Sequence, residues 1–174
     1  MKLKTPLTQK DIESLKSGDK VKLSGIIYTA RDAAHAKLIE LINQKKELPI
    51  PLEGQVIYYV GPAPAKPGEV IGAAGPTTSY RMDPYTPQLF KKGLKAVIGK
   101  GQRSKKVKKS MIKNKSIYLG AVGGAGALLA KCIKSSEIVA YPELGAEAIR
   151  KLEVVDMPLI VINDIYGNDI YEQE

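Results

Sequence analysis

Residues 21–46 read VKLSGIIYTARDAAHAKLIELINQKK, and this stretch decides the fold class. Its first part, residues 21–29, is an apolar run with the length and composition of a β-strand. From Asp32 onward the apolar side chains recur at helical spacing, so we predict a helix that Asp32 caps and that ends near Lys46. A strand that leads directly into a helix indicates an α/β domain.

The same alternation of β-like and helical runs continues along the rest of the chain. No internal repeat and no long linker divides it, so we expect residues 1–174 to form a single domain. Consecutive strands occur beside strand–helix crossovers, which predicts a mixed sheet rather than a purely doubly wound one. The other predicted strands span 55–60, 70–74, 96–98, 116–122, 137–141 and 158–163, and the other predicted helices span 8–18, 86–93, 104–112, 123–134 and 144–152.

The overall composition is that of an ordinary globular protein, with 44% hydrophobic and 26% charged residues. A chain of 174 residues is long enough to bury a substantial core. The sequence contains no apolar run long enough to span a membrane and no secretory signal at its N-terminus. We therefore expect a soluble cytoplasmic protein.

The chain has a single cysteine, Cys132. One cysteine cannot form an internal disulfide, which agrees with a reducing compartment. This chain also cannot hold a metal cluster with its own thiolates alone, because such clusters need three or four. The helical spacing of Cys132 from Leu128 and Leu129 favours a small buried core residue over a nucleophile.

Much of the positive charge lies in residues 100–115, within a chain whose formal net charge is +9. Such a run can bind nucleic acid or another anion, or it can form a solvated helix face. Because no aromatic residue interleaves with the basic ones, nucleic-acid bases would have no surface to stack on. We favour the solvated helix face, and a basic nucleic-acid-binding module stays open as the alternative from a different functional class.

Polar residues cluster first at the junction TARDAAH, residues 29–35. Arg31 stands at the end of the predicted strand, beside a helix N-terminus whose free N–H groups favour anions. Its guanidinium can hold a carboxylate through two parallel hydrogen bonds. Asp32 is favoured as the helix cap. His35, the only histidine, is favoured as a packed or supporting residue, because no cysteine or second histidine completes a metal set.

A second polar cluster is GPTTSYRMD, residues 75–83. Its three consecutive hydroxyl residues can present side-chain donors and backbone N–H groups to one anion. Arg81 follows Thr77 by four residues, so the two share a side if a helical turn begins here. The alternative is a capped turn that leaves Arg81 and Asp83 exposed.

Lys100 lies between two glycines directly after a predicted strand, in the sequence IGKG of residues 98–101. This position suits contact with a phosphate or a carboxylate. The full phosphate-loop pattern is missing, so a nucleotide site of that kind is not supported. The glycine-rich residues 120–126 also lack the dinucleotide-binding pattern, and we interpret them as close backbone packing at a helix entry.

Taken together, these segments resemble the β subunit of class I, iron–sulfur fumarases, which is equivalent to the C-terminal domain of the single-chain forms. The matching pieces run in order through nearly the whole chain: residues 25–35, 75–83, 98–101, and 158–161 through 167–169. The resemblance implies an α/β fold of the swivelling β/β/α kind, with three layers and a parallel central sheet.

The same resemblance implies a hydro-lyase that reversibly hydrates fumarate, a small dicarboxylate, to (S)-malate. Its [4Fe–4S] cluster would be ligated by cysteines of a partner α subunit, with no metal ligand in this chain. The chain would be active only together with that subunit, in a heterotetramer of two α and two β subunits.

Carried over residue by residue, the resemblance assigns Arg31, Arg81 and Lys100 to binding the substrate carboxylates. Thr77 would be the catalytic base that removes the proton next to a carboxylate. A threonine hydroxyl is a poor base unless its alkoxide is strongly stabilised, and the three cations can supply part of that stabilisation.

Further residues of the matched pieces bear on positioning and on substrate identity. Asp32 and His35 would complete the catalytic set by positioning, through hydrogen bonds to the groups that touch the substrate. Tyr80 stands where many relatives carry a small residue, which leaves fumarate and L(+)-tartrate both open. The ARDAAH form and Met82–Asp83 favour a fumarase over an L(+)-tartrate dehydratase β subunit. A non-catalytic domain that has kept the fold is a further possibility.

Overall fold

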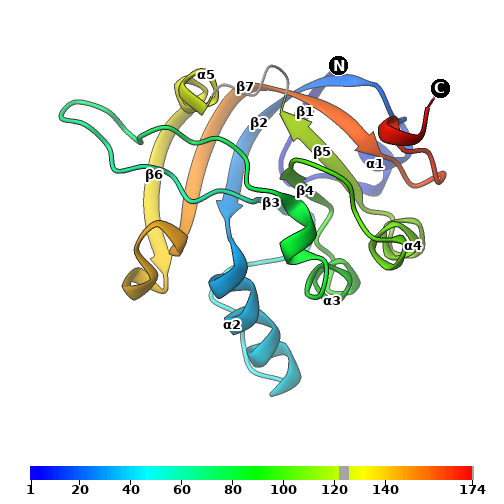
Figure 1. The fold of residues 1–174 in the computed structure, drawn as a ribbon, viewed down its shortest axis with the longest axis horizontal. Helices are drawn as coiled ribbons and strands as arrows, with labels where there is room; N and C mark the ends of the chain where they lie inside the picture. The colour runs from blue at the N-terminus through cyan, green and yellow to red at the C-terminus, as the bar shows by residue number, and fades with distance from the viewer. Residues whose placement is uncertain (122–125, 174) are drawn as a thin grey trace.

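The structure is a computed structural model that describes residues 1–121 and 126–173 (Figure 1). In this part of the chain, no helix is both long and apolar enough to cross a membrane. The strands are β1 (Lys2–Lys4), β2 (Lys20–Thr29), β3 (Val56–Tyr58), β4 (Ala96–Gly99), β5 (Ile117–Ala121), β6 (Ile133–Ala140) and β7 (Ile149–Asn163). The helices are α1 (Gln9–Glu13), α2 (Asp32–Asn43), α3 (Thr86–Lys91), α4 (Lys105–Asn114) and α5 (Gly126–Lys131), with short 3-10 helices η1 (Ser79–Met82), η2 (Pro142–Glu147) and η3 (Ile170–Glu172).

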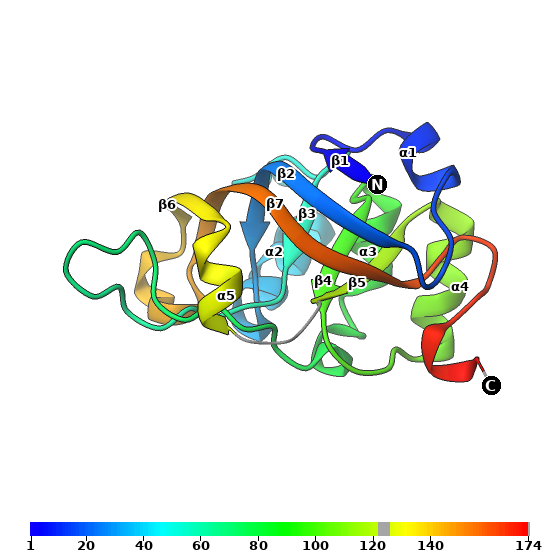
Figure 2. The same cartoon turned by 90° about the horizontal axis from the view of Figure 1, so that it is seen from above.

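Neighbouring strands follow the order β1-β2-β3-β4-β5-β7-β6, and an additional pairing joins β2 to β7. That pairing closes β2, β3, β4, β5 and β7 into a barrel-like sheet, and Figure 2 shows β2 and β7 side by side across the other strands. Strands β1 to β5 pair in parallel, whereas β7 is antiparallel to β2, β5 and β6. The predicted α/β class with a mixed, mostly parallel sheet is therefore confirmed.

Both faces of β3, β4 and β5 are buried, and successive side chains of each strand serve two different cores. Side chains in a strand point alternately to opposite faces. Tyr58, Ile98 and Leu119 join the core inside the barrel. Val97 and Tyr118 each precede one of these residues in its strand and point to the opposite face. They pack with residues of α2, α3 and α4, which lie together on one side of the sheet (Figure 1). Burial on both faces explains why these strands are continuous apolar runs rather than alternating ones.

Capping side chains set the starts of two helices, close to where the sequence predicts these helices to begin. Thr8 and Asp11 form the reciprocal hydrogen bonds of a capping box at the start of α1. Ser104 Oγ accepts a hydrogen bond from Val107 N and caps α4. In both cases a short polar side chain satisfies N–H groups that the first turn leaves free.

The predicted cap of α2 is wrong. Arg31 occupies the N-cap position without a side-chain cap bond, and Asp32 is the first helical residue. Glu147 of η2 accepts the hydrogen bond from Ala33 N instead, at 3.3 Å. A carboxylate from a distant segment thus satisfies the helix start, which local sequence signals could not indicate.

The predicted strand 70–74 is also wrong, because these residues form an irregular arm of a long loop. A backbone hydrogen bond of 2.9 Å joins Ala63 N to Ala73 O across the two arms of that loop. A Cβ on Gly72 would lie 2.6 Å from Pro64 O, so glycine lets the arms approach closely. Prolines in the opposite arm lack the N–H groups that a ladder of strand hydrogen bonds needs.

The predicted helix 144–152 is the third error. A 3-10 helix, η2, ends at Glu147 after Gly145 adopts a positive φ of 62°, and β7 begins at Ile149. Because β7 pairs with β2, β5 and β6, sheet pairing overrides the helical spacing of this stretch. The predicted strand 158–163 is the final part of this longer strand.

Two predictions reach residues 122–125, which lie outside the described part of the chain. The predicted strand 116–122 corresponds to β5 as far as Ala121. The predicted helix 123–134 corresponds to α5, after which β6 begins at Ile133 rather than continuing the helix. Cys132 lies between them, half-buried against the barrel core, so its predicted burial is only partial.

Candidate active site

The parallel strands β2 to β5 end at the same edge of the sheet. Thr29 of β2 pairs with Tyr58 of β3, and Gly99 of β4 pairs with Gly120 of β5, so neighbouring strands stop in register. The segments beyond these strand ends contain all six candidate residues. The carboxyl ends of parallel strands are the usual place for ligand sites in α/β proteins.

The GPTTSYRMD segment returns to this edge after the long loop that follows β3. Thr77 N donates a hydrogen bond to Tyr59 O at 2.7 Å, and Ser79 N donates one to Lys100 O at 2.9 Å. Thr78 and Lys100 form an isolated parallel β-bridge. The structure therefore brings Thr77 beside Lys100, although the two are far apart in the sequence.

Glycine is required directly before Lys100. A Cβ on Gly99 would collide with the side-chain oxygen of Ser79 and would lie 2.8 Å from Tyr59 Cδ2. Without a Cβ, the end of β4 can lie flat against the GPTTSYRMD segment. Lys100 follows at once and is exposed.

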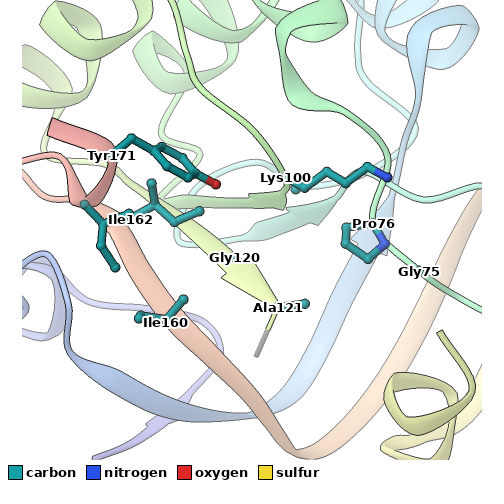
Figure 3. Close-up of a pocket in the computed structure, with 10 residues that line it drawn as sticks. Gly75, Pro76, Lys100, Gly120, Ala121, Ile160, Ile162 and Tyr171 are labelled. Atoms are coloured by element: carbon teal, nitrogen blue, oxygen red, sulfur yellow. The ribbon is translucent and has the colours of Figure 1, made fainter. Parts of the chain in front are cut away.

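A pocket of about 400 Å³ opens beside Lys100 (Figure 3). Lys100, Pro76 and Tyr171 border it, and the rest of its lining is glycine and aliphatic: Gly75, Gly99, Gly120, Ala121, Ile160, Ile162 and Ile170. Arg31 and Thr77 are outside this lining. The described residues therefore enclose no single cavity around all of the candidate residues.

Arg31 lies at the end of β2, one residue before α2 begins. Its side chain packs against the backbone that follows β3, where a Cβ on Gly61 would be 3.2 Å from Arg31 Nη1. The side chain is one quarter exposed, yet its Nε is buried and has no hydrogen-bond partner among the described residues. A buried donor without a hydrogen-bond partner costs roughly 1–3 kcal/mol of stability. An anion that accepted a hydrogen bond from Arg31 would remove that cost. Asp32 Oδ1 lies 3.8 Å away, within reach of an ion pair but too far for a hydrogen bond.

His35 is fully buried one turn into α2, beside Tyr59 and Tyr85. Its Nδ1 lies 2.8 Å from Arg31 O, which can only accept, so Nδ1 carries a proton. Its Nε2 is buried without a partner among the described residues. The pKa of His35 is lowered to about 4, mainly because burial disfavours the charged ring; the nearby charge of Arg103 also lowers it, while the hydrogen bond to Arg31 and the charge of Asp32 partly oppose the shift. His35 therefore holds the carbonyl of Arg31 as a neutral group.

This buried histidine predicts a pH dependence of stability. Between about pH 6.5 and pH 4, His35 is protonated in the unfolded chain but not in the folded chain. The free energy of unfolding therefore falls as the pH falls. The loss should approach about 1 kcal/mol for each pH unit below 6. Urea unfolding at pH 7 and pH 5 measures it. A His35→Asn variant, which keeps a donor but does not titrate, should lose this part of the slope, and an unchanged slope would contradict the prediction.

Arg81 and Tyr80 lie on η1, and both are exposed, Tyr80 to 63%. Asp83, at the end of the same segment, is not exposed. Its Oδ1 accepts a hydrogen bond of 2.7 Å from Arg103 Nε, within an ion pair. The alternative interpretation of this segment, a capped turn with both charges exposed, therefore holds for Arg81 and fails for Asp83.

Arg103 was not predicted from the sequence as a residue of the site. The predicted solvated face of α4 is formed by its exposed lysines: Lys105, Lys106, Lys109 and Lys113. Arg103 belongs to the same basic run but is 5% exposed and lies beneath the GPTTSYRMD segment. One signal was available, because an arginine immediately before the capping Ser104 precedes the helix and need not share its solvated face.

The described residues contain no group of three or more His, Cys, Asp or Glu side chains that could hold a metal ion. The donors at the strand edge are instead cations and hydroxyls: Arg31, Arg81, Lys100 and Thr77. Such groups suit the carboxylates of a substrate rather than the coordination of iron.

Comparison of the sequence with known proteins shows the family of this chain. The family described as "Fumarase C-terminus" matches the chain over residues 1–174. The anaerobic class I fumarate hydratase of Escherichia coli (strain K12) is 46% identical over 156 residues, which cover 88% of this chain and 28% of that protein. Fumarate hydratase 2 of Leishmania major is 40% identical over 176 residues, covering 98% of this chain and 31% of that protein.

A relative of similar length also matches. The putative L(+)-tartrate dehydratase subunit beta of Methanocaldococcus jannaschii is 43% identical over 173 residues, covering 96% of this chain and 89% of that protein. The chain thus spans about a third or less of the fumarate hydratases it matches, but most of this subunit. With a family match over its whole length, the chain belongs to the fumarase C-terminus family.

Proposed function

We propose that this chain is the β subunit of a hydro-lyase that interconverts fumarate and (S)-malate. The observation that carries the proposal is the edge of the sheet, where Arg31 has a buried donor without a hydrogen-bond partner among the described residues and lies at the same edge as Thr77 and Lys100. Two carboxylates on one small substrate need several cationic donors, and this edge offers three with Arg81.

A separate α subunit would supply the other half of the site. The matched fumarate hydratases are about three times longer than this chain, so most of their length has no counterpart here. The relative of similar length is named as a subunit. We propose a hetero-oligomer of two α and two β subunits, in which the α subunit ligates a [4Fe–4S] cluster. When bound, that cluster would act as a Lewis acid on the substrate hydroxyl.

In this proposal the chain's own residues bind and deprotonate the substrate. Arg31, Arg81 and Lys100 bind the two carboxylates, so the substrate is held in one orientation. Thr77 accepts the proton from the carbon next to a carboxylate as malate loses water. The nearby cations stabilise the alkoxide that Thr77 needs in order to act as a base.

The supporting residues and the domain organisation complete the proposal. Neutral His35 fixes the carbonyl of Arg31, and Asp32 orients its guanidinium electrostatically from 3.8 Å. We propose that residues 1–174 form one domain of the three-layer swivelling β/β/α type. The cytoplasmic location expected from the sequence stays a prediction.

The test is to purify the chain with an α-type partner under anaerobic conditions and to assay malate, fumarate and L(+)-tartrate. We expect turnover of malate and fumarate by the complex and none by this chain alone. Salt-sensitive nucleic-acid binding by the isolated chain, without hydro-lyase activity of the complex, would instead favour the basic module built on α4.

L(+)-tartrate dehydration is the second candidate function. The relative matched over nearly its whole length carries that name, and Tyr80 stands exposed in the segment that would bind the substrate. Tartrate has a second hydroxyl group, and a phenol near Arg81 could bond to it. Turnover of tartrate alone would replace the fumarase assignment with this one.

A further inference from the structure

We propose that Arg103 is a positioning residue that fixes Thr77 and Arg81 relative to Lys100. The role rests on the hydro-lyase activity proposed above, since it concerns the geometry of the same site. Arg103 does not reach the exposed edge of the sheet, so it would act through the residues it contacts rather than on the substrate.

The guanidinium of Arg103 is an unusual group for the interior of a protein. Its side chain is 0% exposed, although the other basic residues of the run 100–115 that surround α4 are exposed or half-exposed. A buried charge is costly unless ion pairs and hydrogen bonds compensate it. The contacts that compensate Arg103 identify the parts of the fold that it joins.

The first set of contacts joins Arg103 to the GPTTSYRMD segment and to α3. Arg103 Nε donates to Asp83 Oδ1 at 2.7 Å, and Nη2 donates to Thr86 Oγ1 at 2.9 Å. The other oxygen of Asp83 accepts from Ser104 N at 2.9 Å, and Thr86 Oγ1 donates to Met82 O at 2.8 Å. The end of the segment that carries Thr77 and Arg81 is thus fixed to residues 103–104.

The second set joins Arg103 to the residue that follows β3 and to the start of β5. Its guanidinium carbon lies 5.2 Å from the ring centroid of Tyr59 and 4.9 Å from that of Tyr118. Tyr59 is the residue whose carbonyl accepts the hydrogen bond from Thr77 N. The hydroxyl of Tyr118 bonds to Ser79 Oγ at 2.7 Å and donates to Gly101 O at 2.8 Å. It thereby links the GPTTSYRMD segment to the IGKG segment.

These contacts meet at one cation, which explains why the residue is an arginine. A planar guanidinium can donate hydrogen bonds in its plane to Asp83 and Thr86 while it contacts aromatic rings. A lysine would keep the charge but could not fill these roles together. A small shift here would move Thr77 relative to Lys100, and misplacement of about 1 Å can cost roughly 10²-fold in rate.

The experiment replaces Arg103 by lysine in the complex with the α-type partner. We expect kcat for malate to fall about 10- to 100-fold, with a smaller change in KM. We also expect faster hydrogen exchange of the peptide that contains the amides of Thr77 and Ser79. The unfolding midpoint should stay well above the assay temperature. Lys106→Met, which removes an exposed charge from the same run, is the matched control and should leave all three measurements unchanged.

Asp83→Asn provides a second variant if Arg103→Lys does not fold. It should reproduce the loss of kcat, and the double variant should be no worse than the more affected single one, because the two residues act as a pair. A purely structural role predicts a lower unfolding midpoint with unchanged kcat, and that result would overturn the proposal. Unchanged hydrogen exchange would overturn it as well. If the wild-type complex turns over no dicarboxylate, the proposed function fails, whereas hydrogen exchange still decides the role of Arg103.

Discussion

Replacing Thr77 by valine should lower kcat of the assembled enzyme by roughly 10²- to 10⁴-fold, the range that a general base contributes. Valine has nearly the shape of threonine but cannot accept a proton. The backbone hydrogen bond from Thr77 N to Tyr59 O does not involve the side chain, so the fold should be kept. Steady-state kinetics with malate measure the effect, and KM should change little because Arg31, Arg81 and Lys100 still hold the carboxylates.

Two further variants separate the hydroxyl of Thr77 from its surroundings. Thr77→Ser keeps the hydroxyl and should retain much of the activity. Thr78→Val removes the neighbouring hydroxyl, and its backbone bridge to Lys100 does not depend on the side chain, so kcat should stay close to the wild-type value. A Thr77→Val enzyme with wild-type kcat would place the base elsewhere in the site.

The sequence predicts the strand edge and its candidate residues because the relevant signals are local. The run before Arg31 is apolar and the run after it has helical spacing, so the junction is visible without the fold. The glycines beside Lys100 mark the end of a strand, and the structure places Gly99 against the side chain of Ser79, where a Cβ would not fit. Such signals locate the segments, but they do not show that the GPTTSYRMD segment bridges to Lys100.

The features that the sequence could not predict depend on contacts between distant segments. The barrel closes because β7 pairs with β2, and the helical spacing of residues 144–152 gives no sign of that pairing. Glu147 replaces Asp32 at the start of α2 for the same reason. Arg103 is buried because Asp83, Tyr59 and its other partners surround it, whereas its sequence neighbours are solvated lysines. A local pattern cannot distinguish these outcomes from the simpler ones.

Replacing Gly99 by alanine should cost about 3 kcal/mol of stability or slightly more, at the upper end for an overpacked site. The new Cβ would collide with Ser79 Oγ and would lie 2.8 Å from Tyr59 Cδ2. Neither neighbour can move away easily. The hydroxyl of Ser79 is bonded to Tyr118, and the ring of Tyr59 is packed between His35 and Arg103. Urea unfolding of the chain measures the loss.

A double-mutant cycle tests whether the collision with Ser79 is the cause. Ser79→Ala alone should cost about 1 kcal/mol, because it removes one buried hydrogen bond. In the Gly99→Ala background the same change removes the atom that the new methyl group meets, so it should raise stability instead. The rescue should be partial, because the ring of Tyr59 still lies 2.8 Å from the new methyl carbon. Additive losses in the double variant would show that β4 and the GPTTSYRMD segment are not packed in the way that holds Thr77 beside Lys100.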